Sequence, residues 1–165
     1  MDTIDNMKHE IELYPLQNFK IILDHEVRKT RRYGHPLSLI HIAVQADPDT
    51  PVMQHGAEMA AINVLDVELR NSDLPCRDEH DFFVLLPSTD ETGARKACER
   101  LEKSLNCTQE NYEGIRFQVH AFIGLSSTNA DPAASADGLM EQASTAMNQA
   151  RRNNSSKTVV YSDLK

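Results

Sequence analysis

Residues 70–83 constrain the fold of this chain more than any other stretch. They begin where an amphipathic helix ends at Arg70, and they lead into the apolar run Phe82–Leu86. A short apolar run bounded by polar residues predicts a buried strand. The residues before it include several carboxylates, one histidine and two arginines. We therefore interpret them as a tight loop at the start of the strand, and we expect the chemistry of the protein to lie there.

The length and charge of the chain limit its function. Its 165 residues are enough for one domain with a buried core. A formal net charge of −8 argues against nucleic-acid binding but leaves room for a local basic pocket. No apolar run is long enough to span a membrane, and Met1–Asp5 lacks the features of a signal peptide, so we expect a cytoplasmic protein without a membrane partner. The three cysteines (Cys76, Cys98 and Cys107) lack CxxC spacing, which favours reduced thiols in the core.

Apolar periodicity predicts alternating helices and strands. Residues 1–12 are polar and weakly patterned, so we expect a flexible N-terminal tail followed by one domain over residues 13–165. A sheet with helices packed over it is the economical arrangement for such an alternation. Ser88, with Glu91 three residues later, predicts a capping box at the start of the third helix. The predicted helices are 16–32, 56–70, 89–105 and 139–150, and the predicted strands are 37–44, 80–86, 115–126 and 158–161.

Four segments match one known family in order and spacing. Arg31–Leu37 is similar to RRYG-x-PL, Arg70–Leu74 to RxSDL, Phe82–Pro87 to EF-x-VLLP, and Val119–Ser126 to the strand VSIGVA. With these segments the chain, from Leu16 onward, resembles a GGDEF (diguanylate cyclase) domain of bacterial signalling proteins. The resemblance implies an α+β, palm-like fold with a ferredoxin-like core, in which helices flank a central mixed five-stranded sheet.

The signature of that family is altered. Anchored on Phe82, it reads Asp78-Glu79-His80-Asp81-Phe82, and the stretch back to Arg70 is one residue short. In the family two glycines let the hairpin backbone approach the guanine and phosphates of GTP, whereas here two acids take their places. A like-charge contact at about 4 Å costs about 1 kcal/mol in water and roughly 4 kcal/mol at an effective dielectric constant of about 20. We expect a degenerate signature.

The metal-binding positions are altered as well. The resemblance places the magnesium-binding aspartate of the first strand at Ala43, a second aspartate at Gln45, and the metal-binding acid of the signature at His80. Magnesium prefers oxygen ligands, and metal-dependent phosphoryl transfer without the metal loses its main charge stabilisation. We therefore expect no magnesium, no other metal or cofactor, no catalytic residue and no enzymatic activity.

The resemblance leaves the product-binding motif RxxD in place as Arg70 and Asp73. Relatives bind cyclic di-GMP at this inhibitory site. An arginine can donate two hydrogen bonds to a guanine edge or to phosphate oxygens, and an aspartate can accept from guanine N1 and N2. Arg100 falls where relatives place a further arginine, often from a neighbouring subunit. Arg77, Lys29 and Arg28 are additional candidates for contacts with the ligand.

The sequence thus predicts a catalytically inactive receptor that binds cyclic di-GMP and signals to an unidentified motility, biofilm or other signalling protein, with homodimerisation left open. Two alternatives are a residual diguanylate cyclase and an interaction scaffold that binds no nucleotide. At single residues, Arg70 and Asp73 could form a plain surface ion pair, and Arg77 could pack the hairpin instead of binding ligand. The acidic signature is either a solvated turn or a metal site. His41 and His120 are expected in the core or on a sheet face.

Overall fold

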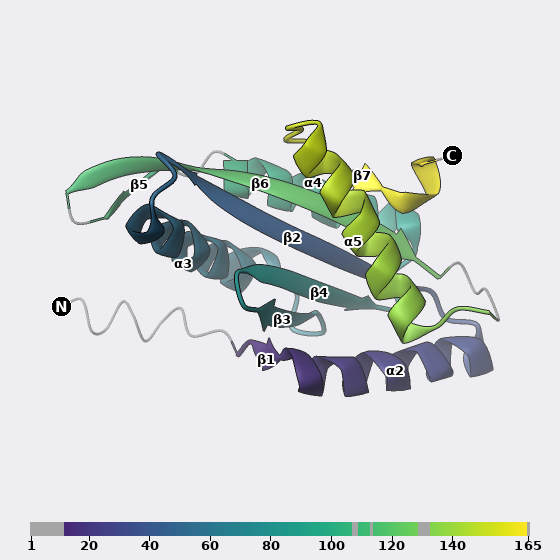
Figure 1. Ribbon diagram of the computed structural model, residues 1–165. Coiled ribbons are helices and arrows are strands. Elements are labelled where there is room, and N and C mark those ends of the chain that lie inside the picture. Colours follow the sequence, from purple (N-terminus) through teal and green to yellow (C-terminus); the bar gives the residue numbers. More distant parts are fainter. Residues whose placement is uncertain (1–11, 107–108, 113, 129–132, 165) are drawn as a thin grey trace.

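The computed structural model describes residues 12–106, 109–112, 114–128 and 133–164 (Figure 1). The predicted tail, apart from Glu12, lies outside the described residues, as does Cys107. Each predicted helix and strand has a counterpart in the structure, but at two places in the chain one strand directly follows another, so the predicted strict alternation is wrong. In chain order they are β1 (Tyr14–Pro15), α2 (Leu16–Tyr33), β2 (Leu37–Asp47), α3 (Pro51–Glu68), β3 (Leu74–Asp78), β4 (Asp81–Pro87), α4 (Glu91–Asn106), β5 (Gln109–Tyr112), β6 (Ile115–Ser127), α5 (Ala136–Arg152), β7 (Val159–Val160) and the 3-10 turn η1 (Tyr161–Asp163).

The described strands form one mixed sheet in the order β1-β3-β4-β2-β6-β5. β7 also pairs with β6, but at Gly124 and Leu125, further along that strand than the residues that pair with β5. The sheet has seven strands, so the predicted number of five is wrong. Two of the strands, β1 and β7, are only two residues long, and both pair in parallel with a longer neighbour. The predicted strand 158–161 corresponds to β7, whereas β1 was not predicted, because two residues are too few for a hydrophobic alternation to be recognised in a sequence.

Helices cover both faces of the sheet (Figure 1). Along β4, Phe82, Val84 and Leu86 belong to the core beneath α3 and α4. The alternate residues Phe83 and Leu85 belong to the core beneath α2 and α5. Because successive side chains of a strand point to opposite faces, a strand between two helical layers must be apolar at every position. This explains why the run Phe82–Leu86 is apolar at every position.

The residues predicted as a loop before β4 instead form strand β3. Leu74–Asp78 pairs antiparallel with β4, and Asp78 lies opposite Asp81. The hairpin therefore closes through the two residues Glu79 and His80, and Glu79 has a positive φ of 55°. Pairing with the buried β4 satisfies the backbone of a polar stretch that has little strand propensity of its own.

Helix ends follow local chemistry. Gly34 ends α2 with φ 74°, and its N–H donates to the carbonyl of Thr30. At the start of α4, the carboxylate of Asp90 accepts a hydrogen bond of 2.8 Å from the N–H of Gly93. Asp90 is thus the cap, and the predicted cap Ser88 is wrong because Ser88 lies in the preceding turn with φ 51°. No helix in the described part of the chain has the length and apolar character needed to cross a bilayer.

The packing of α5 on β6 depends on Gly124. A Cβ atom added there would lie 2.2 Å from the carbonyl oxygen of Ala143 and 2.3 Å from the amide nitrogen of Met147, both backbone atoms of α5. We predict that Gly124→Ala lowers the free energy of unfolding by about 3 kcal/mol, because the helix must move away from the sheet. Urea denaturation followed by circular dichroism measures this change.

Gly93→Ala is the matched control. Its added Cβ would meet only side-chain atoms, Thr89 Cγ2 at 3.2 Å and Asp90 Oδ1 at 3.4 Å. Alanine is also the better helix former, so we expect a change of less than about 1 kcal/mol. Equal stability of both variants and the parent protein would contradict the close packing of α5 on β6.

Candidate functional site

Arg70 and Asp73 meet at the entry to β3. The backbone N–H of Arg70 donates to Asp73 Oδ2 at 2.9 Å, and its guanidinium donates to Oδ1 at 3.2 Å and to Oδ2 at 3.5 Å. The Asp73 side chain is only 2 % exposed, whereas that of Arg70 is 56 % exposed. A buried carboxylate that accepts several donors is held in place, so Asp73 orients an arginine that faces solvent.

Arg70 also contacts the turn that precedes α4. Its Nη2 donates to Thr89 Oγ1 at 2.9 Å, and that hydroxyl donates to the carbonyl of Pro87 at 2.9 Å. The exposed guanidinium borders a surface depression of about 300 Å³. The depression is lined by Glu12, Tyr14, Asp66, Leu69, Arg70, Asn71, Asp73, Leu74 and Pro75. The polar stretch at the end of α3 therefore forms a small concave site with one exposed cation.

Arg100 lies on the exposed side of α4. Its Nε is 3.9 Å from Glu68 Oε1, at the C-terminal end of α3. Glu68 also accepts a hydrogen bond of 2.8 Å from Ser104, one turn further along α4. Arg100 thus lies beside the helix end that Arg70 follows, and half of its side chain is exposed.

Arg77 contacts a different residue, Glu58 of α3, which the sequence analysis missed. Glu58 Oε1 accepts from Arg77 Nη2 at 2.6 Å, and Oε2 lies 2.9 Å from His80 Nδ1 and 3.1 Å from Gln54 Nε2. The Glu58 side chain is 3 % exposed. This carboxylate therefore ties both sides of the hairpin turn to α3. The geometry agrees with the alternative in which Arg77 packs the hairpin.

The last acid of the signature, Asp81, contacts the opposite layer. Asp81 Oδ2 is 2.9 Å from His41 Nε2, and His41 Nδ1 is 2.9 Å from Ser144 Oγ of α5. The His41 ring stacks on Phe83 with a centroid distance of 4.3 Å. His41 is buried, as predicted, and both of its ring nitrogens are engaged. The turn residues Glu79 and His80 are exposed, and the hairpin around them is tied to both helical layers through His80 and Asp81.

The side chains at the positions that the family resemblance assigns to magnesium do not form an oxygen donor set. Ala43 is fully buried opposite Asp81 in the β2–β4 pairing. His80 faces Glu58, and Asp81 faces His41. Among the described residues there is no group of three His, Cys, Asp or Glu side chains arranged to hold a metal ion. These residues do not fit magnesium, and the absence of a cofactor stays a prediction.

Arg28 and Lys29 lie on α2, apart from the other candidates. Each pairs along the helix, Arg28 with Asp24 at 2.9 Å and Lys29 with Glu26 at 3.4 Å. They border a separate surface depression made only of α2 residues. The structure therefore distributes the predicted ligand residues over three places: the end of α3, the hairpin turn and the outer face of α2.

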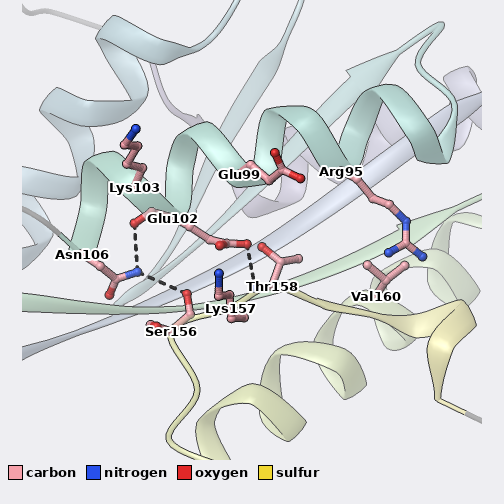
Figure 2. A pocket seen from close by; sticks show the side chains of 9 residues that line it. All are labelled: Arg95, Glu99, Glu102, Lys103, Asn106, Ser156, Lys157, Thr158 and Val160. Atoms are coloured by element: carbon pink, nitrogen blue, oxygen red, sulfur yellow. Dashed lines mark hydrogen bonds between the residues drawn. The ribbon is translucent and has the colours of Figure 1, made fainter.

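Another depression, of about 550 Å³, lies between α4 and the C-terminal segment, and no sequence pattern indicated it (Figure 2). Its walls are joined by hydrogen bonds. Glu102 Oε2 accepts from the N–H of Thr158 at 2.8 Å, and Asn106 Nδ2 donates to the carbonyl of Ser156 at 3.4 Å (Figure 2). At one end Arg95 pairs with Asp163 at 3.0 Å and with Glu91 at 2.9 Å. These two contacts raise the pKa of Arg95. Bonds between its own walls thus occupy much of its polar surface.

The two described cysteines are buried free thiols, as predicted. Burial, with a smaller contribution from Asp78, raises the pKa of Cys76 to about 12. Burial likewise raises the pKa of Cys98 to about 12. At neutral pH both are protonated thiols, and reactivity requires the thiolate. They are core residues of the sheet and of α4.

Comparison with known proteins identifies the class. The family model for the diguanylate cyclase GGDEF domain matches residues 59–157. The chain therefore belongs to the GGDEF family. No curated protein matches the chain.

Solved structures share the fold. The GGDEF domain of DgcB from Caulobacter crescentus, in complex with cyclic di-GMP, has a TM-score of 0.76 at 12 % identity over 91 % of this chain and 92 % of that one. Diguanylate cyclase SiaD of Pseudomonas aeruginosa, in complex with its activator SiaC, has a TM-score of 0.81 at 21 % identity over 90 % of this chain and 58 % of SiaD. The active GGEEF domain of a Vibrio cholerae diguanylate cyclase has a TM-score of 0.77 at 15 % identity over 91 % of this chain and 98 % of that one. The predicted α+β, palm-like fold is confirmed.

The same findings correct the prediction that the chain is not an enzyme. That prediction, made from the altered signature and from Ala43, is wrong: the matched family is that of diguanylate cyclases, and an active member shares the fold. The physical reason is that substitution removes individual side chains and leaves the scaffold in place. The hairpin still carries the carboxylates Asp78 and Asp81. Substituted positions alone are no measure of turnover.

The buried Glu58 gives a test of the hairpin geometry. We predict that Glu58→Gln lowers the free energy of unfolding by about 2 kcal/mol, because it leaves the partly buried Arg77 without its counter-charge. Thermal and urea denaturation measure the change. The same substitution at Glu26, whose partner Lys29 is half exposed, should cost less than about 0.5 kcal/mol. Equal effects at the two positions would contradict a buried ionic tie.

Proposed function

We propose that this GGDEF domain binds cyclic di-GMP at the depression beside Arg70 and reports the level of this second messenger to a partner protein. The observation that carries the proposal is the exposed guanidinium of Arg70, held at the edge of a concave site by a buried Asp73. A preorganised arginine loses little freedom on binding, and its planar fork matches phosphate oxygens and the guanine edge.

The roles of the two motif residues differ in this proposal. Arg70 contacts the ligand. Both carboxylate oxygens of Asp73 are occupied by Arg70, so Asp73 positions the arginine and reaches guanine N1 and N2 only if the guanidinium swings away. The depression of about 300 Å³ is at the lower limit of small-molecule sites. We infer that one guanine–phosphate half of the ligand occupies it.

Arg100 is the proposed second contact. It lies on α4 beside the end of α3, and its pairing with Glu68 at 3.9 Å is long and exposed. Such a pair contributes little to stability, so a ligand phosphate can replace Glu68 at small cost. The DgcB structure contains cyclic di-GMP on the same fold, and SiaD is seen with a protein activator. These two structures support a nucleotide ligand and a protein partner for this chain.

We predict that Arg70→Ala weakens the binding of cyclic di-GMP by about 10- to 100-fold, the loss expected for one bidentate contact. Isothermal titration calorimetry measures the affinity. Arg70→Lys keeps the charge but not the fork, and it should recover only part of the loss. Arg116→Ala, which removes an exposed arginine from β6, is the matched control and should bind like the parent protein.

Unchanged affinity in Arg70→Ala would remove the proposed site. Absence of any binding heat in the parent protein would remove the receptor function and favour the scaffold that binds no nucleotide. In that case a partner protein should still be recovered when nucleotide is absent.

The cyclase reaction of the family is the second candidate function, and the match over residues 59–157 favours it. Incubation with GTP and magnesium or manganese, followed by chromatography, shows whether cyclic di-GMP forms. Asp81→Ala is the control, because it removes a hairpin carboxylate that is partly exposed. Turnover that survives in this variant would place the reaction outside the hairpin.

A further inference from the structure

The outer face of α2 concentrates cations on an otherwise acidic chain. Five of the 17 Lys and Arg residues, but only two of the 25 Asp and Glu residues, lie within α2. The inner face of the helix packs Phe19, Leu23 and Val27 into the core. The charged side chains therefore point away from the sheet, and α2 forms one margin of the molecule (Figure 1).

We call the residues His25, Arg28, Lys29, Arg32 and Tyr33 the basic face. They line a shallow depression of about 560 Å³ on the surface of the helix. The two ion pairs of this face, those of Arg28 and Lys29, are exposed pairs within the helix that contribute little and break readily. Arg32 has no acidic partner in the described part of the chain, and its guanidinium lies 5.9 Å from the centroid of the Tyr33 ring. The basic face is thus available to an external anion.

Two large side chains stand exposed at opposite ends of this cationic surface. Ile21 is 73 % exposed and Tyr33 is 62 % exposed. An apolar residue and a tyrosine beside lysines and arginines are typical of helices that lie in the interface of a membrane, where the ring and the alkyl chain enter the headgroup region. The cations alone would also suit a nucleic acid or an acidic protein, and the isoleucine and tyrosine that flank them favour a lipid surface.

We propose that the basic face docks the domain peripherally on an anionic lipid surface. The headgroup phosphates contact Arg28, Lys29 and Arg32, while Ile21 and Tyr33 enter the interfacial region. Contact through one helix at the margin keeps the acidic remainder of the chain away from the like-charged membrane. Electrostatic interactions with the membrane surface are screened beyond a Debye length of about 8 Å, so the repulsion of the distant acidic residues is weak. The lack of an apolar spanning segment predicts no membrane partner, but a peripheral contact of this kind needs no spanning segment.

The test is co-sedimentation of the purified chain with vesicles of phosphatidylcholine alone and with vesicles that also contain phosphatidylglycerol. We expect binding only to the anionic vesicles, and release as salt is raised. The triple variant Arg28→Gln, Lys29→Gln, Arg32→Gln should bind about 100-fold more weakly, since each cation near such a surface contributes about a factor of five. Ile21→Ser with Tyr33→Ser should weaken binding several-fold and increase its sensitivity to salt.

The matched control is Lys96→Gln, Lys103→Gln, Lys157→Gln, which removes the same charge from exposed positions elsewhere on the chain. It should bind anionic vesicles like the parent protein, and circular dichroism checks that both triple variants are folded. Equal losses in the two triple variants, or no vesicle binding by the parent, would overturn the proposal. Release of the bound protein from vesicles by a low concentration of polyglutamate would assign the basic face to an acidic protein instead. Release by a low concentration of cyclic di-GMP would assign it to a nucleotide.

Discussion

Burial of β2 and β4 on both faces is the constraint on which the rest of the structure depends. Each strand lies between a layer of α3 and α4 and a layer of α2 and α5. A strand covered on both sides cannot shift its register by one residue without exchanging the two sets of core contacts. β3 then pairs with β4 along its whole length, so the positions of its two ends are set as well. The Arg70–Asp73 pair and the cluster of Glu58, Arg77 and His80 lie at those ends.

The two clusters use one kind of interaction with opposite results. At the entry to β3 the buried Asp73 holds Arg70 so that its guanidinium faces solvent. At the far end the buried Glu58 draws Arg77 and His80 onto α3. A strand rises about 3.3 Å per residue, so the five residues of β3 separate the clusters by roughly 16 Å. One end of the hairpin thus presents an exposed guanidinium, and the other end is tied to α3 by a buried carboxylate.

The strongest sequence signals were those that needed no distant partner. The apolar run of β4 and the helix that ends at Gly34 follow from period and from local cap chemistry, and both occur in the structure. The spacing of Arg70 and Asp73 likewise brought them together, because three residues across a turn can share hydrogen bonds. β3 was missed because its own residues have little strand propensity. It forms a strand because it pairs with β4.

The sequence by itself determined the helices α2–α5, the apolar strands at the centre of the sheet and the closeness of Arg70 to Asp73 in the chain, since these depend on neighbours only a few residues away. Only the tertiary structure decided that Glu58 meets Arg77 and His80, and that His41 meets Asp81 and Ser144. These contacts join elements far apart in the chain. Their geometry arises from how the layers pack. A carboxylate in a helix can be identified as a buried, paired charge only once the residues that neutralise it are known.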